Sequence, residues 1–154
     1  MSVSTRPLRD FAEADLRALI DLWVAAWSDT GLCVDFDARR PWLDGHLRAL
    51  RAEGAVVVVG LDREARPAGF VTIDAKTGYL DQLCVAPGER GSGLAVALLD
   101  EAKRRSPGFV DLDVNEANAR ALRFYEREGF VFVTRGLSAL SGLPTIRLRW
   151  KAGG

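Results

Sequence analysis

Apolar residues recur at helical spacing in two stretches near the start of the chain. The first stretch predicts an amphipathic helix with Asp10 as N-cap and Glu13 as its capping-box partner, ending near Trp27. Its inward positions are Leu16, Leu19, Ile20, Trp23, Val24 and Trp27. The second stretch predicts a helix that starts near Asp37 and stops at Gly54. Its inward positions are Trp42, Leu43, Leu47 and Leu50.

The remaining pattern alternates short β-type runs with turns and adds two later helices. The expected strands are 4–9, 55–60, 68–74, 79–85, 109–114, 130–135 and 144–150, and the expected later helices are 93–105 and 118–128. The element order is therefore β-α-α-β-β-β-α-β-α-β-β. A meander followed by a βαβ unit predicts an α/β fold of α+β character, a mixed sheet with helices on its faces. No repeat or linker interrupts it, so residues 1–154 are expected to form one domain.

Composition narrows the class of protein. The chain has 154 residues, of which 48% are hydrophobic and 27% charged, enough apolar surface for a real core. The 21 basic and 21 acidic residues cancel, which argues against a nucleic-acid partner. No apolar run approaches the roughly 18 residues of a membrane span, and the N-terminus lacks a signal-peptide pattern. Cys33 and Cys84 are too few for a disulfide framework, so we expect reduced thiols in a cytoplasmic protein.

The segment 83–95 joins an expected strand to an expected helix through a glycine-rich turn. The first N–H groups of a helix lack intrahelical partners and form an anion site, which glycines make accessible to a diphosphate. A nucleotide-binding loop of Walker type is excluded because no Lys ends the turn. A dinucleotide fingerprint matches Gly91-x-Gly93 but has Val96 at its third small position. A turn that merely joins strand to helix is the remaining alternative.

The same segment resembles a family motif. Arg90-x-x-Gly93-x-Ala95, preceded by Leu83-x-Val85-x-Pro87, is similar to the acyl-CoA-binding motif Gln/Arg-x-x-Gly-x-Gly/Ala of GNAT-superfamily N-acetyltransferases. The resemblance implies a GNAT-like acyl-CoA N-acyltransferase fold that takes acetyl-CoA as cosubstrate. It implies that backbone amides hold the CoA pyrophosphate along Arg90, Gly91, Ser92, Gly93, Leu94 and Ala95. It also implies that the pantetheine arm pairs with the backbone of Leu83, Cys84 and Val85. Ser92 departs from the family pattern, since many relatives carry a basic residue there.

A second motif lies downstream, on the last expected helix. Asn118, Ala121, Leu122 and Tyr125 share one helix face, which by itself describes an amphipathic helix with a buried tyrosine. The pattern Asn-x-x-Ala-x-x-x-Tyr-Glu-x-x-Gly-Phe over 118–130 looks like the second GNAT motif. The resemblance places Asn118 beside the cofactor and makes Tyr125 the acid that protonates the leaving CoA thiolate. Thiols titrate near 8.5 and tyrosine near 10, so this transfer has a modest mismatch.

The resemblance implies direct acetyl transfer to a primary amine of a small molecule or of a peptide or protein, and leaves these acceptors open. Strands 79–85 and 109–114 are expected to splay, so that the N–H near Leu83 or Cys84 meets the thioester oxygen. Asp81 and Asp113 are the candidate bases, with Glu116 as a third option. The alternative function is a non-catalytic acyl-CoA-binding or interaction module on the same fold.

Other chemistry-bearing residues are expected to be structural. His46, the only histidine, is interpreted as a helix residue rather than the partner of a cysteine nucleophile, and no cluster has metal-ligand spacing. Trp23, Trp27 and Trp42 are expected to pack on the sheet. In a GNAT-like fold the loop 33–36 borders the acceptor pocket, where Asp35 is either an exposed carboxylate or a partner for a cationic amine. Family analogy suggests a homodimer through strands 130–135 and 144–150.

Overall fold

The computed structural model describes residues 7–29, 35–139 and 141–153. The order of helices and strands is the predicted one, with three short 3₁₀ helices added at turns. The elements are β1 (Leu8–Asp10), η1 (Glu13–Asp15), α1 (Leu16–Ser28), η2 (Asp37–Arg39), α2 (Arg40–Ala52), β2 (Val56–Leu61), β3 (Pro67–Ile73), β4 (Leu83–Val85), η3 (Pro87–Glu89), α3 (Leu94–Arg105), β5 (Phe109–Asn115), α4 (Ala119–Arg127), β6 (Val131–Leu137) and β7 (Pro144–Lys151).

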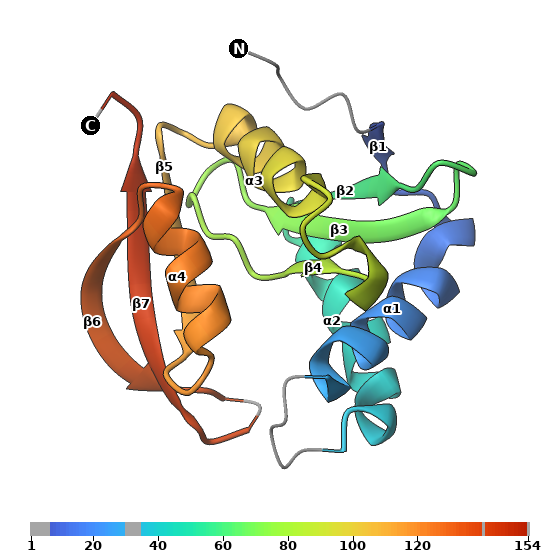
Figure 1. Cartoon of the computed structure of the whole chain (residues 1–154), viewed down its shortest axis with the longest axis horizontal. Helices are drawn as coiled ribbons and strands as arrows, with labels where there is room; N and C mark the ends of the chain where they lie inside the picture. The colour runs from blue at the N-terminus through green and yellow to red at the C-terminus, as the bar shows by residue number, and fades with distance from the viewer. Residues whose placement is uncertain (1–6, 30–34, 140, 154) are drawn as a thin grey trace.

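The strands form two antiparallel sheets, in the orders β1-β2-β3-β4 and β5-β7-β6. Between them the described residues make a single parallel bridge, Tyr79 with Asp111. The α/β class is confirmed, but in place of one mixed sheet the structure has two antiparallel sheets joined at this parallel bridge. Figure 1 shows the division, with β5, β6 and β7 standing apart from the sheet that carries β2, β3 and β4.

Both faces of the first sheet are covered by helices, which explains its continuous run of valines. Val57 and Val59 of β2 pack in one cluster with α1 and α2, whereas Val58 packs in a second cluster with α3. Successive side chains of a strand point to opposite faces, so a strand buried on both faces is apolar at every position. The helices lie on opposite faces of the sheet in Figure 1.

The expected strand 79–85 divides between the two sheets. The Leu80 N–H donates to Asp111 O and the Asp111 N–H donates to Gly78 O, both at 2.8 Å, so the segment starts against β5. By Gln82 its carbonyl accepts from Thr72 of β3, also at 2.8 Å. Regular pairing therefore begins only at β4, and β4 and β5 diverge as the family resemblance implies. The divergence opens a gap whose two sides carry the candidate site.

The predicted N-cap of the first helix is wrong. Asp10 is the last residue of β1 and pairs with Val58, so its backbone is extended. Asp15 fills the capping-box position expected of Glu13, because its Oδ2 accepts the N–H of Ala12, the N-cap residue of η1, at 2.9 Å. Arg9 binds both oxygens of Asp15 at 2.6 and 2.7 Å, and this hydrogen-bonded contact lowers the pKa of that carboxyl. The local pattern is overridden because pairing of β1 with β2 holds Asp10 in the sheet.

The edge strand β6 leaves its side chains exposed along its whole length. Its large apolar side chains are 45% to 73% exposed, and they are Val131, Phe132, Val133 and Leu137. The homodimer expected through this strand and β7 stays a prediction. No helix in the described ranges is long and apolar enough to cross a bilayer.

Candidate active site

Two cavities meet at the gap between β4 and β5. The first, of about 430 Å³, lies toward α1 and α2 and is called here the aromatic cavity, after the rings of Trp23, Trp27, Phe36 and Trp42 that line it. The second, of about 790 Å³, lies against the segment before α3 and is called the glycine-loop cavity. Leu83, Asn118, Ala121 and Tyr125 line both cavities. A molecule that reaches from one cavity to the other must pass these four residues.

The glycine-loop cavity is lined by open backbone amides. The N–H groups of Gly91, Gly93, Ala95 and Val96 have no hydrogen-bond acceptor among the described residues, and all four residues line the cavity. Gly93 has a φ of +90°, which a residue with a side chain adopts only with strain, and its missing Cβ leaves open space. Unpaired amides at the N-terminus of α3 make a site for an anion.

The other three residues of the predicted loop have different tasks. The Arg90 and Ser92 N–H groups donate to Pro87 O and Glu89 O, and the Leu94 N–H donates to Ser92 Oγ at 3.3 Å. The Arg90 side chain forms an ion pair with Asp29 at the end of α1. These amides shape the turn, whereas the amides that remain open are those of the two glycines and of the first turn of α3.

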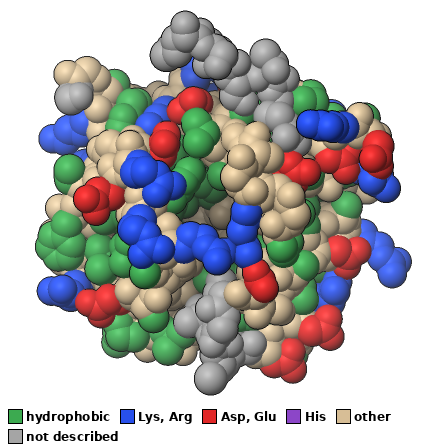
Figure 2. Space-filling view, viewed as in Figure 1, with side chains coloured by type: hydrophobic (Ala, Val, Ile, Leu, Met, Phe, Trp, Pro, Cys, Tyr) green, Lys and Arg blue, Asp and Glu red, His purple; other side chains and the backbone are tan. Residues whose placement is uncertain are grey.

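Positive charge reaches the glycine-loop cavity from α4. Arg120 and Arg127 line it together with Arg90, and Glu89 is its one acidic lining residue. Figure 2 shows Lys and Arg side chains gathered in a band across this face, beside a hollow. The arginines of α4 therefore put cations on the glycine-loop cavity from an element outside the loop.

The open edge of β4 faces the gap. Phe70 pairs with Cys84, and the bonds at Gln82 and Ala86 run toward β3, so the backbone groups of Leu83 and Val85 point to the other side. Leu83 and Val85 line the glycine-loop cavity, but Cys84 does not. The Cys84 thiol is buried beside Leu22 O, and burial raises its pKa to about 12. Of the three predicted residues, Leu83 and Val85 offer backbone groups to a ligand, and Cys84 belongs to the core.

Tyr125 stands where the two cavities join. It is 8% exposed and sits between the rings of Phe124 and Phe130, with centroids 5.2 and 5.3 Å away. Its hydroxyl makes no hydrogen bond to any described residue. Burial raises its pKa above the usual value near 10, so the hydroxyl keeps its proton at neutral pH. Asn118, about two turns earlier, is the predicted N-cap of α4, and its Oδ1 accepts the Ala121 N–H at 3.2 Å.

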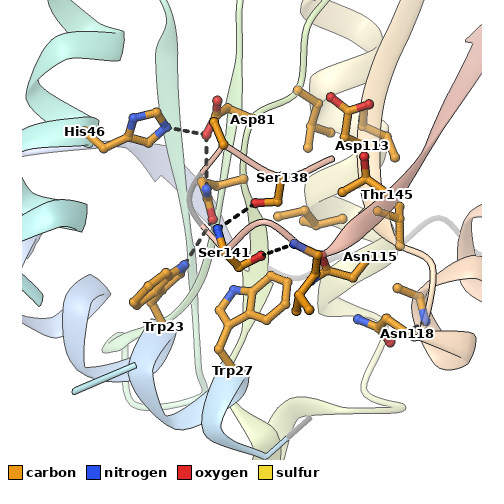
Figure 3. A pocket seen from close by; sticks show the side chains of 18 of the residues that line it. Trp23, Trp27, His46, Asp81, Asp113, Asn115, Asn118, Ser138, Ser141 and Thr145 are labelled. Atoms are coloured by element: carbon orange, nitrogen blue, oxygen red, sulfur yellow. Dashed lines mark hydrogen bonds and ion pairs between the residues drawn. The ribbon is translucent and has the colours of Figure 1, made fainter. Parts of the chain in front are cut away.

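Asp81 lies on the wall of the aromatic cavity, and a histidine supports it. His46 Nε2 lies 2.6 Å from Asp81 Oδ1, and the imidazole stacks on Trp42 at 4.4 Å. Gln82 Nε2 donates to the same oxygen at 3.1 Å while its Oε1 accepts from Trp23 Nε1. Figure 3 shows His46 and Asp81 on one side of the cavity, with Asp113, Asn115 and Thr145 across from them.

Sequence reasoning missed His46 as a site residue. Its spacing of four from Trp42 indicates a shared helix face. No residue pattern links His46 to Asp81, because the two residues are 35 positions apart in the chain.

Asp113 also lines the aromatic cavity, but its carboxylate is already bound. Arg147, its cross-strand neighbour on β7, donates to both oxygens at 3.0 and 2.9 Å, and the Tyr79 hydroxyl donates to Oδ2 at 2.7 Å. The Arg147 hydrogen bonds lower the pKa of the Asp113 carboxyl. A carboxylate stabilised in this way is a poor proton acceptor. Glu116 pairs with Arg135 and lines neither cavity. Asp81 is therefore the best placed of the three predicted bases.

The remaining candidates are Asp35, Cys33 and any cluster of metal-binding side chains. Asp35 is exposed, and its Oδ1 accepts the Ala38 N–H at 3.1 Å, so it caps η2. Cys33 falls outside the described residues. No group of three or more His, Cys, Asp or Glu side chains in the described part of the chain could hold a metal ion.

Comparison with known proteins gives both sequence and structural relatives. The peptidyl-lysine N-acetyltransferase YjaB of Salmonella typhimurium is 32% identical over 72 residues, covering 47% of this chain and 48% of that protein. The mycothiol acetyltransferase of Beutenbergia cavernae is 41% identical over 75 residues, covering 46% and 25%. The chain spans about half the length of the first curated relatives it matches, from 43% to 62%.

Solved structures share the fold along nearly the whole chain. The PaiA N-acetyltransferase of Thermoplasma acidophilum, solved with coenzyme A, superposes with a TM-score of 0.79 at 16% identity, covering 96% of this chain and 99% of that one. Residues 16–130, which contain both motifs and the gap between β4 and β5, match the acetyltransferase (GNAT) family. This chain therefore belongs to the GNAT acetyltransferase family.

Proposed function

We propose that this chain is an acetyl-CoA-dependent N-acetyltransferase that moves an acetyl group directly to a primary amine, with Tyr125 as general acid. The observation that carries the proposal is the position of the Tyr125 hydroxyl. It is protonated, unpaired among the described residues, and located where a donor cavity and an acceptor cavity meet. Although the ring is buried, the hydroxyl oxygen is not sealed off, since no fully buried side-chain oxygen among the described residues lacks a partner, so it is open to a ligand in the cavities.

The glycine-loop cavity suits the donor. A diphosphate fits the open amides of Gly91, Gly93, Ala95 and Val96, and Arg120 and Arg127 supply further positive charge. An arm that contains amides, such as pantetheine, can pair with the outward backbone groups of Leu83 and Val85 as an added strand does. This placement brings the thioester to Leu83 and Tyr125. The Leu83 N–H then stabilises the developing negative charge on the thioester oxygen.

Two proton transfers accompany the reaction, one to Asp81 on the acceptor side of the gap and one from Tyr125 to the leaving sulfur. The ammonium form of the acceptor gives one proton to Asp81, and the neutral amine attacks the thioester carbonyl carbon. As the C–S bond breaks, the sulfur takes the Tyr125 proton. The nitrogen loses its second proton as the amide forms, which restores Tyr125 through water. The proton held by Asp81 leaves to solvent, so each turnover releases CoA and one proton.

His46 supports Asp81 in this scheme. Its Nε2 contact with Oδ1 fixes the carboxylate, and the stacking on Trp42 fixes the imidazole. Asp81 Oδ2 has no partner among the described residues and is the oxygen available to an amine. Positioning of a reacting pair accounts for much of the rate of a direct transfer, because no covalent intermediate with the enzyme is needed.

The first test is thermal unfolding with and without saturating acetyl-CoA, with NAD as the control. A ligand at 100 times its Kd stabilises the folded state by about 2.7 kcal/mol, or roughly 5–10 °C for a domain of this size. We expect that shift with acetyl-CoA and none with NAD. Release of CoA is then followed in the presence of primary amines. Binding of acetyl-CoA with no amine-dependent release would leave the non-catalytic acyl-CoA-binding module as the function.

A further inference from the structure

The acceptor side of the gap has an unusual concentration of aromatic rings. Trp23 and Phe36 are 2% and 6% exposed and pack edge to face at 5.6 Å. Trp27 stacks on Phe36 at 5.6 Å with 29° between the planes, and Trp42 lies 6.1 Å from Trp23. Trp27 and Trp42 are only partly buried, so part of their ring surface remains open to the cavity they line. This wall offers flat apolar surface to a ligand.

The opposite wall carries neutral polar side chains beside the Asp113 carboxylate, whose oxygens Arg147 already binds. It carries Asn115 and Thr145 at the end of the β5–β7 pair, with Ser138 and Ser141 from the connection between β6 and β7. The hydroxyl oxygens of Ser138 and Ser141 accept backbone N–H groups at 3.2 and 3.3 Å. The Ser141 hydroxyl can still donate its proton to a ligand. A ligand in this cavity therefore meets rings on one side and hydrogen-bonding groups on the other.

The charged side chains that line the cavity favour a ligand with a single positive charge. Asp81 Oδ2 is the carboxylate oxygen without a partner among the described lining residues, since Arg147 binds both oxygens of Asp113. His46 is bound to Asp81, and Arg39 has an interaction of its own. A second positive group on the same ligand would find no carboxylate free to receive it and would face Arg39. A buried charge without a partner is costly, so polycations are disfavoured.

We propose, on the basis of the function proposed above, that the acceptor is a small primary amine with a single positive charge on a ring-sized body. Its ammonium group lies against Asp81 Oδ2, and one face of its ring packs on Trp27 and Trp42. The ring's other face, and any hydroxyl groups it carries, meet the wall formed by Asn115, Ser138, Ser141 and Thr145. A cavity of about 430 Å³ holds a molecule of this size. Open-chain diamines and lysine side chains lack the ring that this wall receives.

Binding can be measured without catalysis. Three of the four tryptophans line the aromatic cavity, whereas Trp150 packs beside Lys103. Titration of intrinsic fluorescence with 2-phenylethylamine, tyramine and glucosamine reports binding of ring amines, with putrescine and an N-terminally acetylated lysine peptide as the amines without a ring. The uncharged 2-phenylethanol tests the need for the ammonium group. We expect at least one ring amine to bind about tenfold more tightly than putrescine, the peptide and the alcohol.

Two variants separate the ring wall from general packing. Trp27→Leu removes a lining ring and is expected to weaken binding of the preferred ring amine about fivefold to tenfold, with little effect on putrescine. Trp150→Leu makes the same replacement at a partly buried tryptophan outside both cavities and is expected to keep the preference. The same amines are then compared by kcat/KM for acetyl-CoA-dependent release of CoA.

Each outcome bears on a different claim. Putrescine or the lysine peptide binding and reacting as well as every ring amine would overturn the inference while leaving the proposed acetyl transfer intact. Ring amines that bind selectively but release no CoA would support the inference about the ligand and contradict the proposed reaction. Equal losses in Trp27→Leu and Trp150→Leu would show that the ring wall is structural only, which overturns the inference.

Discussion

His46 Nε2 and Asp81 Oδ1 lie 2.6 Å apart, although the two residues are 35 positions apart in the chain. If Asp81 accepts the amine proton, Asp81→Asn lowers kcat/KM for the amine by about 10²-fold at pH 7, the usual size of a lost general base. His46→Gln keeps a donor near Oδ1, so we expect a smaller loss of about threefold to tenfold. Affinity for acetyl-CoA, measured by calorimetry, should stay within about twofold in both. Full activity in Asp81→Asn would remove Asp81 as the base.

Replacement of Tyr125 by Phe removes the proposed acid and keeps the ring between Phe124 and Phe130. Steady-state kinetics should show kcat reduced by about 10²-fold, with the Kd for acetyl-CoA nearly unchanged. Because burial raises the pKa of Tyr125, the wild-type enzyme should keep its acid in the protonated form up to at least pH 10. Unchanged kcat in Tyr125→Phe would refute the assignment. If Tyr125→Phe also unfolds at a lower temperature, its kcat is measured again on the folded protein alone and compared with the wild-type kcat.

The arginines of α4 should contribute to cofactor binding. Arg120→Gln and Arg127→Gln each remove a cation from the glycine-loop cavity, and we expect KM for acetyl-CoA to rise about threefold to tenfold. The effect should shrink as salt is raised from 50 to 500 mM, because these side chains are exposed. Arg123 is exposed on the same helix and lines neither cavity, so Arg123→Gln is the matched control. An equal rise in KM for all three variants would indicate a general charge effect instead.

The pair of Asp113 with Arg147 should stabilise the fold in a pH-dependent way. Arg147 lowers the pKa of Asp113 in the folded protein, so the stabilisation is complete above the ordinary carboxyl value near 4. It is lost as the pH falls from there through the lowered folded value. Urea unfolding should therefore show Asp113→Asn less stable than wild type at pH 7 and 5, with the difference shrinking toward pH 3. Asp100→Asn, at an exposed position on α3, provides the control. A difference that persists undiminished at low pH would contradict this account.

Cys84 should be unreactive in the native protein. Burial raises its pKa to about 12, so at pH 8 its thiolate fraction is several powers of ten below that of a free thiol. In a Cys33→Ser background, a thiol-reactive dye should label less than a tenth of the protein in an hour, and all of it in about 6 M urea. Rapid labelling without urea would show that β4 opens from its contact with α1.

Elements with a strong local signal were predictable. The valine run of β2 and the spacing of α1 and α2 identify buried strand and helix because a single residue pattern describes each environment. Two predictions failed or changed for a common reason. Asp10 stays in β1 because it pairs with β2, and the segment from Tyr79 passes from β5 to β3 because each half finds a different partner strand. Neither partner can be read from the local sequence.

The sequence by itself determined the family, the glycine loop and the place of Tyr125. Each of these lies within one contiguous motif, in which the fixed geometry of a strand, turn and helix sets the positions of the residues. The tertiary structure alone decided the acceptor side. It joined Asp81 to His46, bound Asp113 to Arg147, and gathered rings from three segments around one cavity. Those relationships depend on packing between elements far apart in the chain. Local residue patterns do not show which distant elements pack against each other.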